Sequence, residues 1–125
     1  MHAIASKAAA QLVNEGYDVA VINPRFTKPI DALAHETYGH EAELVVTLED
    51  HVLIGGYGSA VLELFSEKSV TTPVIRIGWP DKFIEHATTQ DELRLKYGLS
   101  VENTVARVKA QIAEPALTKK QLAIA

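Results

Sequence analysis

The segment Leu44–Leu64, with the sequence LVVTLEDHVLIGGYGSAVLEL, indicates the fold class of the chain. It begins with a continuous apolar run that ends at two acids, Glu49 and Asp50. A cluster of three glycines follows: Gly55, Gly56 and Gly58. The next residues have helical spacing, with Ser59 as the first good capping residue. A buried strand followed by a loop and a helix N-terminus is half of a parallel α/β unit, and functional residues collect at such junctions.

Helices and strands alternate along the rest of the chain. The predicted helices cover residues 3–15, 32–38, 59–67, 89–97 and 101–113, and the predicted strands cover residues 18–23, 44–48 and 73–78. We expect Asp31 to cap the second helix, Thr89 and Glu92 to form a capping box, and glycines 16, 39 and 98 to end helices. This order predicts a three-layer α/β/α fold with a mainly parallel sheet.

The predicted domain covers residues 1–113, and residues 114–125 form a tail in which we find no packing face. Three strands make a small sheet, and an exposed edge on strands this apolar is an association hazard. We therefore expect that the domain pairs with another chain, or that one of its strands is missing from these residues.

The composition excludes several classes of protein. The chain has 125 residues, of which 47% are hydrophobic, so it is long enough for one domain with a real core. Its net charge is −4 and its basic residues are scattered, which does not suit a nucleic-acid partner. It has no cysteine, no apolar run of about 18 residues and no signal-peptide pattern. We expect a cytoplasmic protein with no membrane partner.

The glycine cluster has two interpretations. Gly56–Val61 is a partial dinucleotide fingerprint, but Val61 stands where the third glycine belongs and the motif follows the second strand. A tight turn with close helix–strand approach is the favoured interpretation. A phosphate bound by the glycine loop and Ser59 at the helix N-terminus remains an alternative.

Neither the acids nor the histidines form a catalytic or metal constellation. Glu49 and Asp50 are adjacent on a strand and so point to opposite faces, and we therefore do not expect them to share a proton. A hydrogen bond within the loop or a contact with a neighbouring chain suits them better. His35, His40 and His51 lack metal-ligand spacing, and we expect them at the surface.

Two further groups could make contacts. Arg25 and Lys28 follow the first strand and could bind an anion, pair with Asp31 or meet a carboxylate of a partner. Trp79 and Phe83 flank Pro80, and we expect them to be core or interface anchors.

Three motifs resemble one enzyme family. Arg25–Asp31 (RFTKPID) resembles a motif of 1-deoxy-D-xylulose-5-phosphate synthases, and Val46–Val61 is similar to their strand, acidic pair and glycine loop. Ile77–His86 is similar to a third segment of the same family, and the Leu93–Leu99 stretch also fits. The resemblance covers the chain in order to about Ile112. A transketolase or the β subunit of a 2-oxo-acid dehydrogenase is the alternative, although the segment from Trp79 to His86 favours the synthase.

The resemblance implies a transketolase C-terminal domain, the last third of an enzyme that joins pyruvate to glyceraldehyde 3-phosphate with loss of carbon dioxide. That reaction begins isoprenoid and thiamine precursor synthesis. The family enzyme uses thiamine diphosphate and magnesium, which its upstream domains bind. The resemblance therefore implies that this chain has no catalytic, cofactor-binding or metal residue. It also implies a scaffold role, in contact with upstream domains and within a homodimer. The implied contact and motif residues are Arg25, Lys28, Asp31, Glu49, Asp50, Gly55, Gly56, Gly58, Pro80, Asp81 and Phe83.

The chain departs from the family pattern at its start. The family domain normally has a first strand, with an antiparallel edge strand before it, and both precede the position that aligns with Met1. The resemblance places that first strand between the counterparts of Val19–Ile22 and Leu44–Leu48. We expect either that another polypeptide segment fills this gap or that the two flanking strands close up, so that the chain is a fragment.

Overall fold

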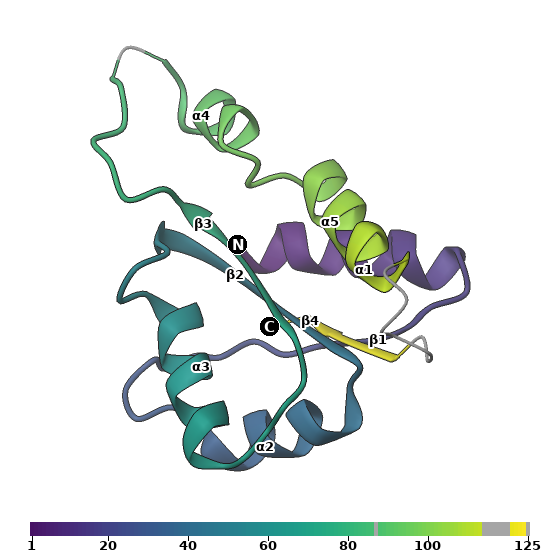
Figure 1. Cartoon of the computed structure of the whole chain (residues 1–125). Coiled ribbons are helices and arrows are strands. Elements are labelled where there is room, and N and C mark those ends of the chain that lie inside the picture. The colour runs from purple at the N-terminus through teal and green to yellow at the C-terminus, as the bar shows by residue number, and fades with distance from the viewer. Residues whose placement is uncertain (87, 114–120, 125) are drawn as a thin grey trace.

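The sheet has four parallel strands in the computed structural model, which describes residues 1–86 and 88–113 and the backbone of residues 121–124 (Figure 1). The strands are β1 (Asp18–Val21), β2 (Leu44–Val52), β3 (Val74–Trp79) and β4 (Gln121–Ile124). Their order across the sheet is β1-β4-β2-β3, and each neighbouring pair is parallel. The predicted parallel sheet is confirmed.

Helices cover both faces of the sheet, as the alternation predicts (Figure 1). Alternate residues of β2 point to opposite sides. Leu44, Val46 and Leu48 pack in one cluster with α1 (His2–Asn14) and α5 (Val101–Ala113). The intervening Val45 packs with α3 (Tyr57–Glu67) in a second cluster, to which α2 (Ala32–Glu41) is adjacent. The three-layer α/β/α architecture follows from this division.

Most of the predicted helix ends are confirmed. Gly16 and Gly98 have φ of 91° and 78°, the left-handed conformation that ends a helix. The Asp31 carboxylate accepts a hydrogen bond from the Ala34 N–H at 3.1 Å. Thr89 and Glu92 form the predicted capping box of α4 (Gln90–Lys96). Local sequence was sufficient for these ends because each is made by residues within one helical turn.

The predicted end of α2 at Gly39 is wrong, since the helix continues to Glu41. Gly39 is buried, and a Cβ there would lie 2.8 Å from Cζ of Phe65 and 3.0 Å from Cγ1 of Val70. The glycine therefore permits α2 to approach α3 closely, at the small cost of a glycine within a helix.

The prediction of a three-stranded sheet is also wrong, because β4 is a fourth strand made from the tail. Gln121–Ile124 pairs with Asp18–Val21 of β1, and Leu122–Ile124 pairs with Leu44–Val46 of β2. It thus occupies the gap at which another polypeptide or direct closure of the flanking strands was expected. The tail lacked a recognisable packing face because a central parallel strand is specified by its neighbours rather than by its own alternation. Residues 114–120 lie outside the described residues.

No helix within the described ranges is both long enough and apolar enough to cross a membrane.

Candidate contact edge of the sheet

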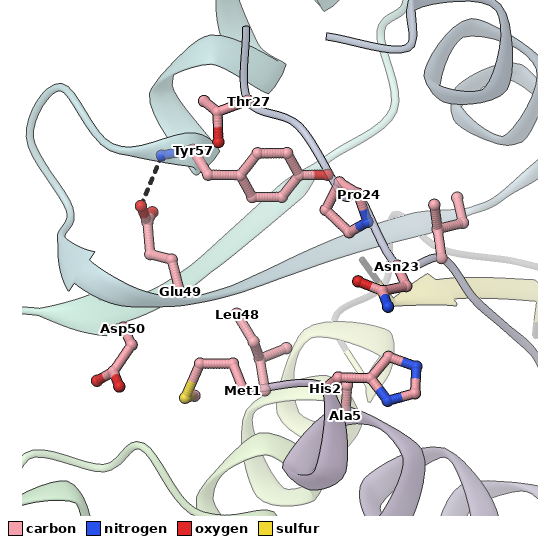
Figure 2. Close-up of a pocket in the computed structure, with 11 residues that line it drawn as sticks. Met1, His2, Ala5, Asn23, Pro24, Thr27, Leu48, Glu49, Asp50 and Tyr57 are labelled. Atoms are coloured by element: carbon pink, nitrogen blue, oxygen red, sulfur yellow. Dashed lines mark hydrogen bonds between the residues drawn. The ribbon is translucent and has the colours of Figure 1, made fainter.

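Glu49 caps the N-terminus of α3 from the carboxyl end of β2. Its side chain is 5% exposed, and its two carboxylate oxygens accept hydrogen bonds from the Tyr57 N–H at 2.6 Å and the Gly58 N–H at 3.1 Å (Figure 2). A negative charge at this position complements the positive end of the helix. The prediction that Glu49 serves as a hydrogen-bonding residue in the loop is confirmed.

The glycines of the loop allow this close approach. A Cβ on Gly56 would lie 2.0 Å from Oε2 of Glu49 and 2.5 Å from the Val52 carbonyl oxygen. A Cβ on Gly58 would lie 2.6 Å from Oγ1 of Thr47. Gly55 has φ of 71°, which favours glycine. The geometry supports a tight turn with close helix–strand contact.

Ser59 is not the helix cap, contrary to the prediction; the N-cap position is Gly56. The Ser59 hydroxyl instead lies inside the first turn, where it donates to the Leu53 carbonyl at 3.0 Å. It also accepts from the Gly55 N–H at 3.1 Å and from Nη1 of Arg76 at 3.0 Å. Ser59 therefore closes the glycine loop onto β3.

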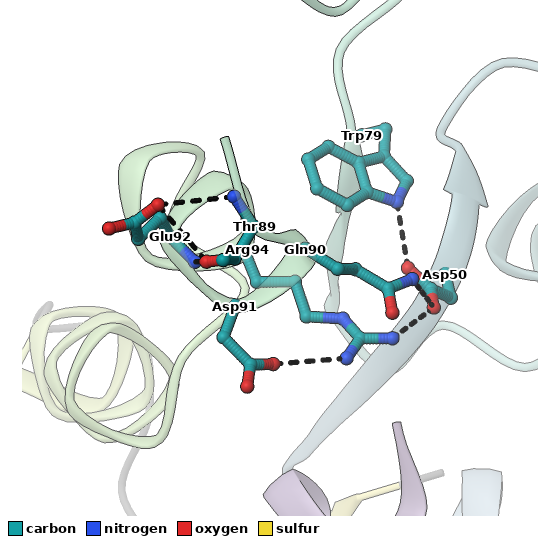
Figure 3. Close-up of polar contacts among 7 residues, drawn as sticks. All are labelled: Asp50, Trp79, Thr89, Gln90, Asp91, Glu92 and Arg94. Carbon is teal, nitrogen blue, oxygen red and sulfur yellow. Dashed lines mark hydrogen bonds and ion pairs between the residues drawn. The ribbon is translucent and has the colours of Figure 1, made fainter. Parts of the chain in front are cut away.

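Asp50, the neighbouring acid, points away from Glu49 (Figure 2) and contacts Gln90 and Arg94 of α4 (Figure 3). It forms an ion pair with Arg94 and accepts a hydrogen bond from Nε1 of Trp79 at 2.8 Å. Gln90 contributes a longer contact of 3.4 Å. Burial alone would raise the pKa of Asp50, but the hydrogen bonds from Arg94 and Trp79 outweigh it and hold the pKa below its usual value.

His35 is buried, at 3% exposure, so the prediction of a surface position is wrong for this histidine. Its Nδ1 lies 2.6 Å from the Asp31 carbonyl oxygen, and its Nε2 lies 2.5 Å from the Tyr57 hydroxyl. Because a carbonyl only accepts, Nδ1 donates, and neutral His35 then accepts from Tyr57 through Nε2. Burial, with a smaller effect from the charge of Glu49, raises the pKa of Tyr57, which keeps the hydroxyl protonated. His40 and His51 are exposed, as expected.

The basic motif after β1 is presented to solvent. Arg25 and Lys28 are exposed, and neither forms an ion pair with any residue that the structure describes. Of the three possible partners, Asp31 is therefore excluded within the described residues, and Asp31 caps α2 instead. Phe26, between the two cations, is 69% exposed. This loop has the composition of a contact surface, with cations beside an exposed aromatic ring.

Some residues of the third motif, Ile77–His86, pack against the core, and others are exposed at the surface. Trp79 packs against the core cluster beneath α1 and α5, and its ring makes an edge contact with Tyr97 at a centroid distance of 5.7 Å. Phe83 is fully exposed, and Asp81 is exposed beside it. Pro80 lines a hollow with Tyr97 and Asn103. Trp79 is thus a core anchor, whereas Phe83 has no cover within the described part of the chain.

A cavity of about 350 Å³ lies at the carboxyl edge between β1 and β2 (Figure 2). It is lined by Met1, Asn23, Thr27, Leu48, Glu49 and Asp50, among others. Of the predicted site residues, the structure brings Glu49, Asp50, Gly55 and Gly56 together around Thr27. Sequence reasoning missed Tyr57, Arg76 and Arg94. Their partners lie from 17 to 44 residues away in sequence, beyond the reach of any local pattern.

The edge does not suit a phosphate or a metal ion. The first free N–H groups of α3 already donate to Glu49, so an anion there would meet a carboxylate rather than a positive helix end. Within the described residues, no three histidine, aspartate or glutamate side chains lie close enough to hold a metal ion. The residues at this edge therefore do not fit the diphosphate and magnesium that the sequence resemblance implies for a whole enzyme.

Comparison with known proteins identifies relatives of this chain. Residues 1–104 match the family described as "Transketolase, C-terminal domain". The chain is 47% identical over 115 residues to the 1-deoxy-D-xylulose-5-phosphate synthase of Acidobacterium capsulatum, covering 90% of this chain and 18% of that protein. It is 50% identical over 100 residues to the synthase of Methylacidiphilum infernorum, covering 79% of this chain and 16% of that protein. The chain thus spans less than a fifth of the length of these relatives.

A solved structure agrees with the sequence relatives. A split gene transketolase, described as an inactive beta4 tetramer, superposes with a TM-score of 0.79 at 38% identity. The match covers 87% of this chain and 35% of that one. The chain therefore resembles the C-terminal domain of 1-deoxy-D-xylulose-5-phosphate synthases in sequence. By family match, sequence relatives and fold, it belongs to the transketolase C-terminal domain family.

Proposed function

We propose that this chain is the C-terminal contact domain of a 1-deoxy-D-xylulose-5-phosphate synthase-type transferase and has no catalysis of its own. The whole assembly would use thiamine diphosphate and magnesium, held by polypeptide other than this domain, to join pyruvate to glyceraldehyde 3-phosphate. It would work in the cytoplasm as a homodimer, in isoprenoid and thiamine precursor synthesis. The similarity to such synthases over a small part of their length supports this assignment.

One structural observation carries the proposal. Some of the motif side chains form hydrogen bonds and ion pairs within the domain at the carboxyl edge of the sheet, and others are exposed to solvent. Glu49 and Asp50 are fully engaged within the domain, holding α3 and α4. Arg25, Lys28 and Phe83 are exposed and make no ion pair or ring contact within the described residues. Acids whose hydrogen bonds and ion pairs are made within the domain suit a scaffold. An exposed surface of basic and aromatic side chains suits contact with another polypeptide.

Complementation tests this function. The purified chain is incubated with pyruvate, glyceraldehyde 3-phosphate, thiamine diphosphate and magnesium, alone and with the Acidobacterium capsulatum synthase truncated to remove its matching region. We expect no product from either piece alone and product from the mixture. Product from the chain alone would contradict the absence of catalysis, and an inactive mixture with no complex between the pieces would contradict the contact role.

A charge reversal locates the contact. Arg25→Glu places an acid where an unpaired cation now faces solvent, so we expect it to weaken complementation without unfolding the domain. Lys7→Glu is the matched control, because Lys7 is an exposed cation on α1 outside the family motifs. Equal losses in both variants would show a general charge effect and remove Arg25 from the contact surface.

A further inference from the structure

A hollow of about 350 Å³ lies beside the carboxyl half of β3, between that strand and residues of the helices α4 and α5 that follow it (Figure 1). Three cations line it: Arg76 of β3, Lys96 of α4 and Arg107 of α5. None of its lining residues in the described part of the chain is an acid. This basic hollow therefore gathers positive charge in a chain whose net charge is −4.

Arg76 is held in place by neutral oxygens. Its Nη1 donates to the Leu53 carbonyl at 3.0 Å and to the Ser59 hydroxyl at 3.0 Å. These contacts occupy one nitrogen of a group that has five N–H donors. Arg76 forms no ion pair with any residue that the structure describes. The guanidinium is thus fixed at the hollow while its charge is left without a counter-ion among those residues.

Arg107 reaches the same point of β3 from α5. Its Nη1 donates to the Arg76 carbonyl at 2.9 Å, and it too lacks an ion pair within the described ranges. Partial burial lowers the pKa of Arg107, because burial disfavours the charged form and no acid beside it offsets that cost. A bound anion would supply the missing counter-charge.

Tyr97 brings further positive charge to the hollow, which its side chain also lines. The Nζ of Lys82 lies 4.8 Å from the centroid of the Tyr97 ring, and the Nζ of Lys96 lies 5.7 Å from it. Lys96 also pairs with Glu85 at 2.7 Å, but both side chains of this pair are more than half exposed, at 54% and 73%. Such a surface pair is weak and competes little with a ligand.

The size and the walls of the basic hollow suit a small ligand. Its volume lies at the lower end of the range for small-molecule sites, which begins at about 300 Å³. Leu53 and Ile77 add apolar residues to the lining. The hollow thus has room for a charged group with a small organic group attached.

We propose that the basic hollow binds the phosphate group of a small molecule, with Arg76 and Arg107 as its binding residues. The planar fork of a guanidinium matches two oxygens of a phosphate, and two such forks suit a dianion. The site does not use the N-terminus of α3, where Glu49 already accepts from the first N–H groups. This inference does not depend on the proposed function.

Calorimetric titration of the chain at constant ionic strength tests the site. The probes are inorganic phosphate, glycerol 3-phosphate and acetate. We expect saturable binding of both phosphates with dissociation constants below about 1 mM, and binding of acetate at least about tenfold weaker. Tighter binding of the ester would identify a phosphorylated organic molecule as the ligand, and equal binding would identify the phosphate group alone. Either result supports the site, whereas no saturable phosphate binding, or acetate binding as tight as phosphate, overturns it.

Arg107→Gln should weaken phosphate binding at least about tenfold, because it removes one charged fork. Lys7→Gln, at an exposed cation of α1, is the matched control for net charge and should change binding less than about twofold. Arg107→Lys should fall between Arg107→Gln and the wild type, because lysine keeps the charge but not the fork. Equal losses in Arg107→Gln and Lys7→Gln overturn the proposal.

Nuclear magnetic resonance of the wild-type chain decides the question if Arg107→Gln does not fold. Phosphate should shift the side-chain Nε–H signals of Arg76 and Arg107 more than that of Arg25, which is an exposed arginine outside the hollow. Shifts of similar size at all three arginines would show diffuse attraction to positive charge and overturn the proposal.

Discussion

Glu49 and Asp50 are adjacent on β2 but hold two different helices, α3 and α4. Their placement at the end of β2 and their opposite directions follow from strand geometry, and the structure confirms both. The partners could not be predicted. Glu49 reaches N–H groups eight and nine residues later only because Gly56 lets the loop fold over it, and Asp50 pairs with Arg94, 44 residues away. Ser59 was predicted as the cap because its residue type suits one, but the N-cap position is Gly56 and the carboxylate that accepts from the first N–H groups is Glu49 of β2.

Replacing Glu49 with alanine tests the cap. The change leaves the Tyr57 and Gly58 N–H groups buried without an acceptor and removes a charge from the helix end, so we expect a loss of about 2–3 kcal/mol in the free energy of unfolding. Urea denaturation followed by circular dichroism measures it. Glu63→Ala is the control, since Glu63 is an exposed acid on the same helix, and its loss should stay within about 0.5 kcal/mol. Equal losses would show that Glu49 does not cap α3.

The pH dependence of stability tests the Asp50 contact. Because the folded pKa of Asp50 lies below its unfolded value of about 3.9, its contribution is complete above that value and is lost as the pH falls through the folded pKa. Asp50→Asn should therefore be less stable than the wild type near neutral pH, and the difference should shrink as the pH falls below about 4. Urea midpoints across this range measure it. Asp81→Asn, at an exposed acid after β3, should show no such convergence.

At the scale of elements, the sequence predicts what is local and fails where packing decides. In the part of the chain that the structure describes, periodicity located the five helices and three of the four strands, and residues within one turn fixed most helix ends. Gly39 was interpreted as a stop because glycine usually ends a helix, but here it serves the contact between α2 and α3. β4 was missed because its position is specified by the unpaired edges of β1 and β2 rather than by its own four residues.

The buried pair of His35 on α2 and Tyr57 on α3 tests how these two helices are joined. Tyr57→Phe removes the donor and leaves Nε2 of His35 unsatisfied, so we expect a loss of about 1–2 kcal/mol in the free energy of unfolding. In a double-mutant cycle with His35→Leu, the two losses should not add, with a coupling of at least about 0.5 kcal/mol. Tyr38→Phe, at a tyrosine that is 39% exposed, is the control. Additive losses would mean that the contact contributes nothing to the pairing of the helices.

At the scale of the whole molecule, two acids at the carboxyl edge of the sheet bond within the domain, and aromatic side chains are exposed elsewhere on its surface. Glu49 and Asp50 bond to groups within the domain, while Phe26 and Phe83 are exposed beside charged residues. The family could be predicted from three motifs, and relatives at 47% and 50% identity agree with it. The sequence did not indicate that the tail enters the sheet, because that depends on the spacing that α1 and α5 impose on β1 and β2.

The mass of the complex tests the central claim most directly. The chain is mixed with the Acidobacterium capsulatum synthase that lacks its matching region, and the product is measured by size-exclusion chromatography with light scattering. The account predicts one species containing equal numbers of the two polypeptides, with a mass that fits a dimer of the reconstituted enzyme. Two separate peaks at the masses of the individual pieces, over micromolar concentrations at which both are folded, would contradict it.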